Sequence, residues 1–330
     1  MRKKIFILVL ITIVVSVFVF TGCNKEHYDY SIDVLQLVTH PALDDAYLGF
    51  KDELTALLNA DGKTVAFNVK NAEGDEENCT TISEQFKVSD SDMVYAIATP
   101  AAIAAAGAIT EKPIIFAAVT DAEVANLVDT NEVPKYNVSG VSDDLAPIQV
   151  KKQLELIKLL VPGITKIAFV YNSGEPNSVA QLATVRAKID EFEMGLTVVE
   201  KAITDQNEIA GQINSIDASE IGAIYLPTDN MIANAAEAVH VANKARTTPL
   251  PIVAAETGIN DSCGIATYGL SYYEMGKQAA RMAYRVLVEG ADISTTPVEW
   301  SEKNPVLSIN QTVADEIGFE IPQTVLDLAD

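Results

Sequence analysis

Short apolar runs alternate with helix-length amphipathic segments along most of this chain. Residues 34–38 predict a buried strand, and residues 43–58 place apolar side chains near the 3.6-residue period of a helix. The alternation continues through predicted strands at 65–69, 93–98, 114–118 and 138–142, and predicted helices at 77–88, 101–109 and 147–160. This order predicts an α/β fold in which parallel strands are covered by helices on both faces.

The second half of the chain repeats the pattern of the first. It predicts strands at 167–171, 197–201, 223–226, 252–255 and 265–270, helices at 178–192, 207–215, 232–245 and 272–289, and a last strand at 306–309. Residues 38–41, 98–100 and 113–117 have counterparts in the same order at 170–173, 226–229 and 251–255. Two similar lobes therefore explain the pattern better than one large sheet.

The repeat also predicts where the chain passes between the lobes. One crossing is expected near 142–146, and two segments beyond the repeat give two more, a three-stranded hinge of the kind that supports clamshell closure. We expect lobe 1 to hold residues 32–143 and 268–296. We expect lobe 2 to hold residues 144–267 and 297–330.

The N-terminal segment has the form of a secretory signal. A basic start at 2–4 precedes a mainly apolar run of 16 residues at 5–20, shorter than the roughly 20 residues that a membrane-spanning helix needs. The sequence Phe20-Thr21-Gly22-Cys23 resembles the lipobox of bacterial lipoproteins, although Phe20 stands where Leu or another aliphatic residue is usual. This resemblance implies a signal peptide over 1–22, acylation of Cys23 by a lipid such as palmitate, a tether over 23–31 and an extracytoplasmic location. An ordinary signal or an uncleaved anchor is the alternative.

Composition excludes several classes of function. Removal of residues 1–22 moves the net charge from −23 to −26, which argues against a nucleic-acid partner. Cys79 and Cys263 are expected to be unpaired, and no His/Cys cluster has metal-ligand spacing, so neither a metal nor a cofactor is expected. The chain has no Gly-x-Ser-x-Gly elbow and no Walker A loop, so we expect no enzyme. Glu175 and Asp229 as a glycosidase-like carboxylate pair are the enzyme alternative.

Polar, turn-like segments follow the predicted strands, where open α/β sheets bind their ligands. An α-amino acid needs anionic partners for its ammonium group and hydroxyl or N–H donors for its carboxylate. Helix capping is the alternative role for several of these side chains. The residues expected near a ligand are His40, Pro41, Thr99, Pro100, Ala101, Thr120, Asp121, Asp143, Asn172, Glu175, Asn177, Ser178, Thr228, Asp229, Asn230, Glu256 and Tyr268.

Roles within this set follow from chemistry. Glu175, Asp229 and Asp143 are the expected ammonium partners. The expected carboxylate donors are Thr99, Thr120, Asn177, Ser178 and the backbone at Ala101, and the alternative for Thr99, Ser178, Asp229 and Asn230 is capping.

Four stretches, at 38–44, 96–102, 171–178 and 226–230, closely resemble the substrate-binding lipoproteins of a bacterial ABC importer family. The best-understood members of that family take up tryptophan and other aromatic amino acids. The resemblance runs from about residue 32 to 326 and includes 272–280 and 309–318, with departures at Ser173 and at Glu256-Thr257. It implies a type I-like periplasmic-binding-protein fold, an amino acid held between two lobes, and an ABC permease and its ATPase as partners. We also expect a monomer.

The side chain of the ligand is expected to meet Pro41, Pro100 and Tyr268, which offer apolar or stacking surface. His40 is expected either to bond an indole or phenol, or to cap the helix that begins near Ala42. No Arg lies in the strand-end segments, so glutamate and aspartate should be rejected. We therefore expect capture of an aromatic amino acid. The alternatives are a sensor subunit for a membrane receptor, and a binder of branched-chain amino acids or another small solute.

Overall fold

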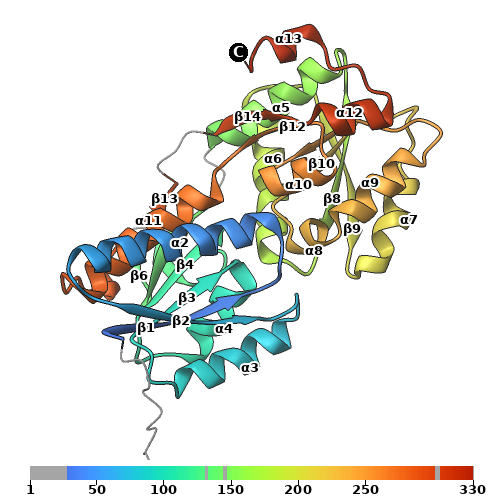
Figure 1. Cartoon of the computed structure of the whole chain (residues 1–330). Coiled ribbons are helices and arrows are strands. Elements are labelled where there is room, and N and C mark those ends of the chain that lie inside the picture. The colour runs from blue at the N-terminus through green and yellow to red at the C-terminus, as the bar shows by residue number, and fades with distance from the viewer. Residues whose placement is uncertain (1–27, 131–132, 144–146, 302–304, 330) are drawn as a thin grey trace, which may run out of the picture.

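The chain forms two α/β lobes that meet along one side of each (Figure 1). This computed structural model describes residues 28–130, 133–143, 147–301 and 305–329. The predicted signal peptide and Cys23 lie outside these residues. Cys79 and Cys263 are buried, one in each lobe, and are free thiols within the described part of the chain, as predicted.

The first lobe is built on a six-stranded, all-parallel sheet. Helices α2 (Pro41–Ala60) and α11 (Tyr272–Leu287) lie on one face, and α3 (Glu76–Lys87) and α4 (Thr99–Ala108) lie on the other (Figure 1). The strand order is β13-β7-β4-β3-β1-β2, with bounds β1 Tyr30–Gln36, β2 Val65–Asn71, β3 Met93–Ile97, β4 Ile114–Val119, β7 Val138–Ser142 and β13 Glu299–Trp300. A short hairpin, β5 (Val128–Thr130) and β6 (Val133–Pro134), lies between β4 and β7 in sequence.

The second lobe repeats this plan, as the sequence predicts. Its strand order β14-β12-β11-β10-β8-β9 matches that of the first lobe, except that its edge strand β14 is antiparallel. The strands are β8 Lys166–Asn172, β9 Thr197–Ile203, β10 Ala223–Leu226, β11 Ile252–Ala254, β12 Ala266–Gly269 and β14 Val306–Ile309. One hydrophobic cluster joins α5 (Pro147–Leu160), α6 (Pro176–Glu191), α12 (Gln311–Ile317) and α13 (Gln323–Leu326). The other joins α7 (Ile209–Asn214), α8 (Asn230–Asn234), α9 (Ala236–Lys244) and α10 (Thr257–Ser262).

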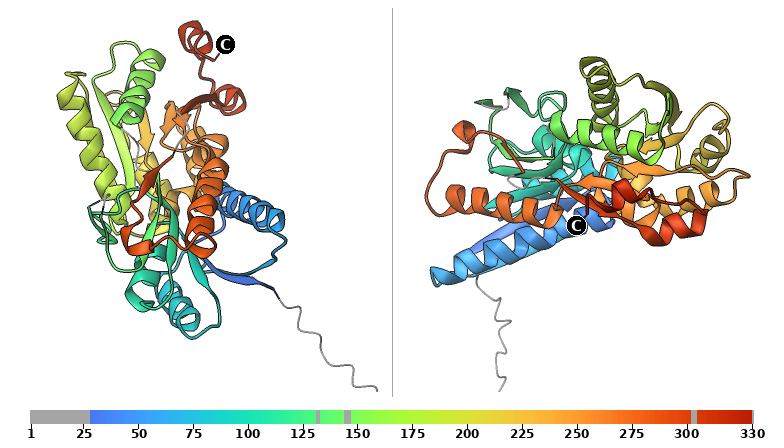
Figure 2. Two further views of the ribbon diagram at one scale, coloured as in Figure 1. Left: turned by 90° about the vertical axis from the view of Figure 1, so that its left-hand side faces the viewer. Right: turned by 90° about the horizontal axis from the view of Figure 1, so that it is seen from above.

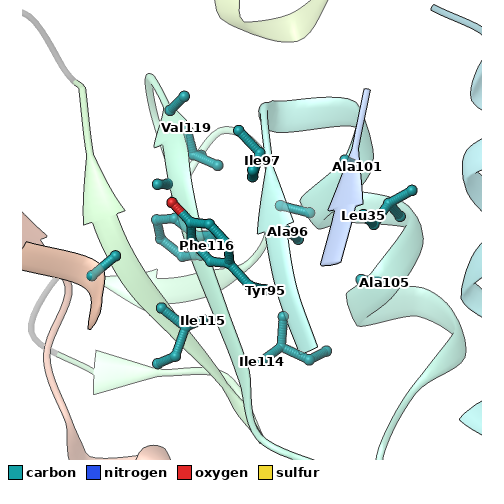
Figure 3. Close-up of a cluster of buried hydrophobic side chains, with 14 of the residues drawn as sticks. Leu35, Tyr95, Ala96, Ile97, Ala101, Ala105, Ile114, Ile115, Phe116 and Val119 are labelled. Carbon is teal, nitrogen blue, oxygen red and sulfur yellow. The ribbon is translucent and has the colours of Figure 1, made fainter. Parts of the chain in front are cut away.

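The centre of the first lobe is packed so tightly that both faces of β3 and β4 are buried. The rings of Tyr95 and Phe50 stack with centroids 3.8 Å apart, and the Tyr95 hydroxyl donates to the Ala46 carbonyl at 3.1 Å. On the other face, Ala101 and Ala105 bring α4 close to the sheet because they have only a methyl side chain (Figure 3). Continuous apolar strands are the expected pattern for a parallel sheet that is covered on both sides.

Helices α2 and α11 lie side by side and touch through two glycines (Figure 2). A Cβ on Gly276 would lie 2.1 Å from the Ala46 carbonyl oxygen, and a Cβ on Gly49 would lie 2.0 Å from that of Tyr273. Neither position has room for a side chain, so the two helix backbones are in direct contact. This contact fixes the start of α11, which lies at the edge of the cleft between the lobes.

The chain passes between the lobes three times, from β7 to α5, from β12 to α11 and from β13 to β14. The predicted three-stranded hinge is therefore confirmed. Two short segments belong to the other lobe from the one expected. Tyr268 and Gly269 extend β12 in the second sheet because they pair with β14, and Glu299-Trp300 pairs with β7 in the first sheet. The predicted helix at 232–245 is two helices, α8 and α9, which separate at Ala235.

Candidate ligand-binding cleft

The carboxyl ends of the two sheets face each other and enclose a narrow polar cavity with a volume of about 10 Å³. A hydrogen bond of 3.2 Å between the hydroxyls of Thr120 and Thr228 joins the lobes beside it. The first lobe contributes His40, Leu43, Ala118, Thr120, Asp143 and Tyr272; the second contributes Asn177, Thr228, Asp229, Asn230, Ala233 and Glu256.

A second hollow adjoins the first and shares Asn230 with it. Its volume is about 140 Å³. Both apolar and polar residues line it. The apolar ones are Leu37, Val38, Pro100 and Met231. The other lining residues, besides Asn230, are Glu73, Gly74, Glu76, Asn172, Glu175, Gln206 and Asn234. The two hollows together run along the interface between the lobes.

Three buried oxygens form an acceptor cluster at the first cavity: Asp143 Oδ1, Glu256 Oε1 and Asn177 Oδ1. None has a hydrogen-bond partner among the described residues. The Tyr272 hydroxyl donates to the other oxygen of Asp143, Oδ2, at 2.7 Å. The amide nitrogen of Asn177 donates to the Thr228 carbonyl at 2.7 Å, which leaves its amide oxygen for the cluster. Such a cluster suits a cationic group with several N–H donors.

Burial makes the charged forms of these carboxyls costly. Asp143 and Glu256 are each 3% exposed and come from opposite lobes. Burial raises the pKa of Asp143, and burial together with the charge of Asp143 raises the pKa of Glu256 to about 8. A cation between them would favour the ionised forms and would hold the two lobes together.

Asp229 has a different role, because both its oxygens are already bonded within the second lobe. Oδ1 accepts from the Ile232 N–H at 2.9 Å and caps α8, while Oδ2 accepts from the Asn172 N–H at 2.6 Å and the Ser178 hydroxyl at 2.7 Å. Burial and the nearby charge of Glu175 raise the pKa of Asp229 to about 7. The capping alternative is confirmed for Asp229. The Ser178 hydroxyl donates its hydrogen bond to this carboxylate rather than to a ligand.

Glu175, an expected ammonium partner, accepts five hydrogen bonds from its own lobe. Three come from the start of α8: the Asn230 N–H at 3.1 Å, the Asn230 amide at 2.8 Å and the Met231 N–H at 3.1 Å. The side-chain amides of Asn172 and Asn177 supply the other two. Glu175 therefore fixes the position of α8 and of two amides at the rim of the cleft.

His40 stands at the N-cap position of α2, but its side chain caps nothing. Both ring nitrogens are buried without a partner in the described ranges, and Asn230 of the other lobe lies against the ring. Burial lowers the pKa of His40 to about 4, so the imidazole is neutral at physiological pH. Of the two roles expected for His40, capping is wrong, and the ring remains available to a ligand.

Two strand ends of the first lobe carry strained backbone. Ala98, just before α4, has a φ of 86°, and Ala118, near the end of β4, has a φ of 56°, both in the region that favours glycine. The Thr99 hydroxyl between them in sequence is buried and has no partner within the described part of the chain. Strain of this kind concentrates at ligand-binding sites, and here it occurs at the carboxyl ends of β3 and β4.

Some expected residues lie outside both hollows. Thr99, Ala101 and Ser178 are buried behind the cavity wall, and Pro41 is exposed at the start of α2. Asp121 caps the turn that follows it, since its Oδ1 accepts from the N–H groups of residues 123 and 124 at 3.0 and 2.8 Å.

Tyr268 also lies outside both hollows. Its ring packs on the core of the second lobe, with Lys152 Nζ 5.1 Å from the ring centroid. The Tyr268 carbonyl accepts from the side-chain amides of Gln149 and Gln153 at 2.9 and 2.8 Å. The expected stacking surface is thus partly buried against the core of the second lobe, outside both hollows.

Sequence reasoning missed Tyr272, Leu43, Ala118 and Ala233, which line the cavity. A signal for Tyr272 was present, because it begins a predicted helix two residues after a predicted strand, and several other candidates also lie between a strand and a helix. The apolar residues carried no such signal. Among the described residues, no group of three or more His, Cys, Asp or Glu side chains is placed to hold a metal ion.

Two repeated α/β lobes, three connecting segments and a polar cavity between the sheet ends define a bilobal solute-binding protein. The chain belongs to the ABC transporter substrate binding protein family, which matches residues 31–330. It is 35% identical to a tyrosine-binding protein of Clostridioides difficile (strain R20291), over 94% of this chain and 91% of that protein. The family consists of binding proteins, so the carboxylate pair of a glycosidase is not the function of this cleft.

Solved structures support the same family. A Streptococcus pneumonia protein in complex with L-Trp is 36% identical, with a TM-score of 0.81 and coverage of 91% of this chain and 98% of that one. The ligand-free, open structure of a substrate binding protein with adhesive properties from Clostridium difficile is 34% identical, with a TM-score of 0.66 and coverage of 89% and 96%. At nearly equal identity, the lobes here match the L-Trp complex better than the open form, in keeping with the Thr120–Thr228 contact. Within the described ranges, no helix is long and apolar enough to cross a bilayer.

Proposed function

We propose that this chain is the extracytoplasmic, lipid-anchored binding subunit of an ABC importer, and that it captures an aromatic amino acid between its lobes. Membership of the family supports the transport role, with an ABC permease and its ATPase as partners. The pattern ending in Cys23 supports the anchor. Relatives named for tyrosine and solved with L-Trp support the ligand class. The acceptor cluster is the observation that carries the proposal.

The acceptor cluster fits the α-ammonium group of an amino acid. That group has a positive charge and three N–H donors, and the cluster offers three oxygens, two of them from carboxyls. Charge-assisted hydrogen bonds are stronger than neutral ones, and closure of the lobes strengthens them further by excluding water. Because Asp143 belongs to lobe 1 and Glu256 to lobe 2, the same ammonium group stabilises the closed arrangement.

Donors for the α-carboxylate lie on the neighbouring strands. Asp143 follows β7, Thr120 follows β4 and Thr99 follows β3, and these three strands are adjacent in the sheet. Adjacent strands are about 4.8 Å apart, so donors for a carboxylate stand beside acceptors for an ammonium group, as the two groups stand on an α-carbon. Of the two hydroxyls, that of Thr120 lines the cavity, and it would bind the carboxylate.

The rest of the cleft favours an uncharged side chain. Of the described residues that line the two hollows, none is Lys or Arg, whereas Leu43, Ala233 and Met231 supply apolar surface. A ligand with an acidic side chain would meet carboxylates without a cation. An aromatic side chain would instead bury apolar area against these residues.

Calorimetry on ligand-stripped soluble protein tests this function. Tyrosine, tryptophan and phenylalanine should bind at least about tenfold more tightly than leucine, a difference of about 1.4 kcal/mol. As a matched control, 3-(4-hydroxyphenyl)propionate keeps the ring and the carboxylate of tyrosine but has no ammonium group, so it should not compete. Equal affinity for leucine, isoleucine or valine would instead establish a branched-chain or broad-specificity binder.

A further inference from the structure

His40 is left without a partner once the α-ammonium and α-carboxylate groups have been placed. Its side chain is 5% exposed, and both ring nitrogens are buried at the cavity wall with no partner among the described residues. A buried polar group without a hydrogen bond is costly, and natural proteins rarely leave one without a reason. Because the ring does not cap α2, stability of the helix does not supply the reason.

The surroundings of His40 suit a neutral polar partner rather than an ion. Burial lowers the pKa of His40 to about 4, so at neutral pH the ring has one N–H donor and one acceptor nitrogen. The side-chain amide of Asn230, which faces the ring from the second lobe, and Asp44 on the same helix raise this pKa by less than burial lowers it. Leu43 beside it is 2% exposed and apolar. A hydroxyl or an aromatic N–H of a ligand is therefore a suitable hydrogen-bond partner for the neutral imidazole.

The order of the strands places His40 at the far end of the site. Asp143 follows β7 and His40 follows β1, with β4 and β3 between them. Three strand spacings amount to about 14 Å of sheet edge. The ammonium and carboxylate groups share one carbon atom, so both fall at the end near Asp143. The residue at the other end therefore meets the outer part of the ligand side chain.

We propose that His40 is a specificity-determining residue that hydrogen-bonds a polar atom on the ring of the ligand, the phenolic hydroxyl of tyrosine or the indole N–H of tryptophan. This inference rests on the proposed function. A site built to bond such an atom discriminates against an analogue that lacks it, because the polar group of the protein is then left unpaired. Phenylalanine, which has the shape of tyrosine without the hydroxyl, should bind less tightly for that reason.

Calorimetry with tyrosine and phenylalanine on His40→Leu and His40→Gln tests the proposal. The wild-type protein should bind tyrosine at least about tenfold more tightly than phenylalanine, a ratio within the range that one ligand hydroxyl gives. His40→Leu should reduce the ratio to about threefold or less while the affinity for phenylalanine changes little. His40→Gln, which keeps a donor and an acceptor, should retain part of the preference.

His240→Gln is the matched control, because His240 lies on α9, outside both hollows, and bonds Glu316 at 2.7 Å. It should leave the tyrosine-to-phenylalanine ratio unchanged. Equal losses for tyrosine and phenylalanine in the His40 variants would mean that the ring binds the part that both ligands share, which overturns the inference and leaves the proposed function standing. An unchanged ratio overturns it as well. Failure of every aromatic amino acid to bind the wild-type protein would refute the proposed function itself.

Discussion

Glu256→Gln tests whether the acceptor cluster binds the α-ammonium group. Glutamine keeps the size of the side chain and one oxygen but removes the charge. Hydrogen bonds to charged groups contribute about 1.5–3 kcal/mol, and each 1.4 kcal/mol is a factor of ten, so affinity for tyrosine or tryptophan should fall about 10- to 150-fold. Asp143→Asn should act in the same way. The binding free energy lost in the double variant should be smaller than the sum of the two single losses, because both side chains contact one ligand group.

The affinity should also depend on pH through Glu256. Burial raises the pKa of this carboxyl to about 8, so near pH 7 the ligand-free protein holds a proton there. A bound ammonium group favours the ionised carboxylate and lowers its pKa, so binding releases a proton and affinity rises as pH increases toward 8. Glu256→Gln should bind with a flatter pH profile.

Titration calorimetry at about pH 6 and about pH 8, in two buffers of different ionisation enthalpy, measures both effects. Asp121→Asn is the matched control: Asp121 is another strand-end carboxylate, but it caps the turn beside it and lies outside both hollows. It should change affinity by no more than about twofold. If Glu256→Gln bound tyrosine as tightly as the wild type and released the same number of protons, the ammonium would lie elsewhere.

Three further predictions concern stability and the anchor. The raised pKa values of Glu256, about 8 against an ordinary 4.5, and of Asp229, about 7 against 3.8, mean that the folded ligand-free protein holds protons that the unfolded chain has released. The free energy of unfolding, measured with urea, should therefore be highest below about pH 4 and should decrease as the pH rises to about 8. The decrease should be smaller in Glu256→Gln, and an equal decrease in both proteins would contradict this. Gly276→Ala should lower the free energy of unfolding by about 1–3 kcal/mol, because the added Cβ meets the α2 backbone. Gly107→Ala should not lower it, because no described atom lies within 4 Å of the added Cβ. Equal denaturation midpoints for the two variants would disprove the contact. Cys23→Ser should abolish labelling by a radioactive fatty acid, and unchanged labelling would exclude the lipid anchor.

Much of the fold could be predicted because its elements have a strong apolar pattern. The bounds predicted for α5, β10 and β14 are those observed, since each is limited by polar or turn residues. The elements that were missed are too short to show a period. The strand β13 has two residues and α10 has six, and both are fixed by contacts with distant parts of the chain.

The candidate site could be predicted only at the level of strand ends. Parallel strands bring their carboxyl ends to one edge, so Thr120, Asp143 and Glu256 reach the cleft whatever their rotamers. The sequence does not tell which carboxylates remain available to a ligand. Glu175 and Asp229 bond the backbone at the start of α8, and for Glu175 that start lies more than 50 residues away in the chain. Such pairings arise only when the lobe has folded.

The glycine contact between α2 and α11 determines when the first lobe can be completed. Gly49 lies near the start of the chain, and its partner helix begins at Tyr272, after almost all of the second lobe. A ribosome delivers the chain from its N-terminus, so α2, β4 and β7 exist for a long time without the helix that covers them. Most of the second lobe, residues 147–269, is synthesised within this interval. Its edge strand β14 and its helices α12 and α13 follow later in the chain. Truncation before residue 272 would therefore remove α11 and β13 from the N-terminal lobe, so the lobe whose synthesis begins first is completed only after most of the second lobe has been made.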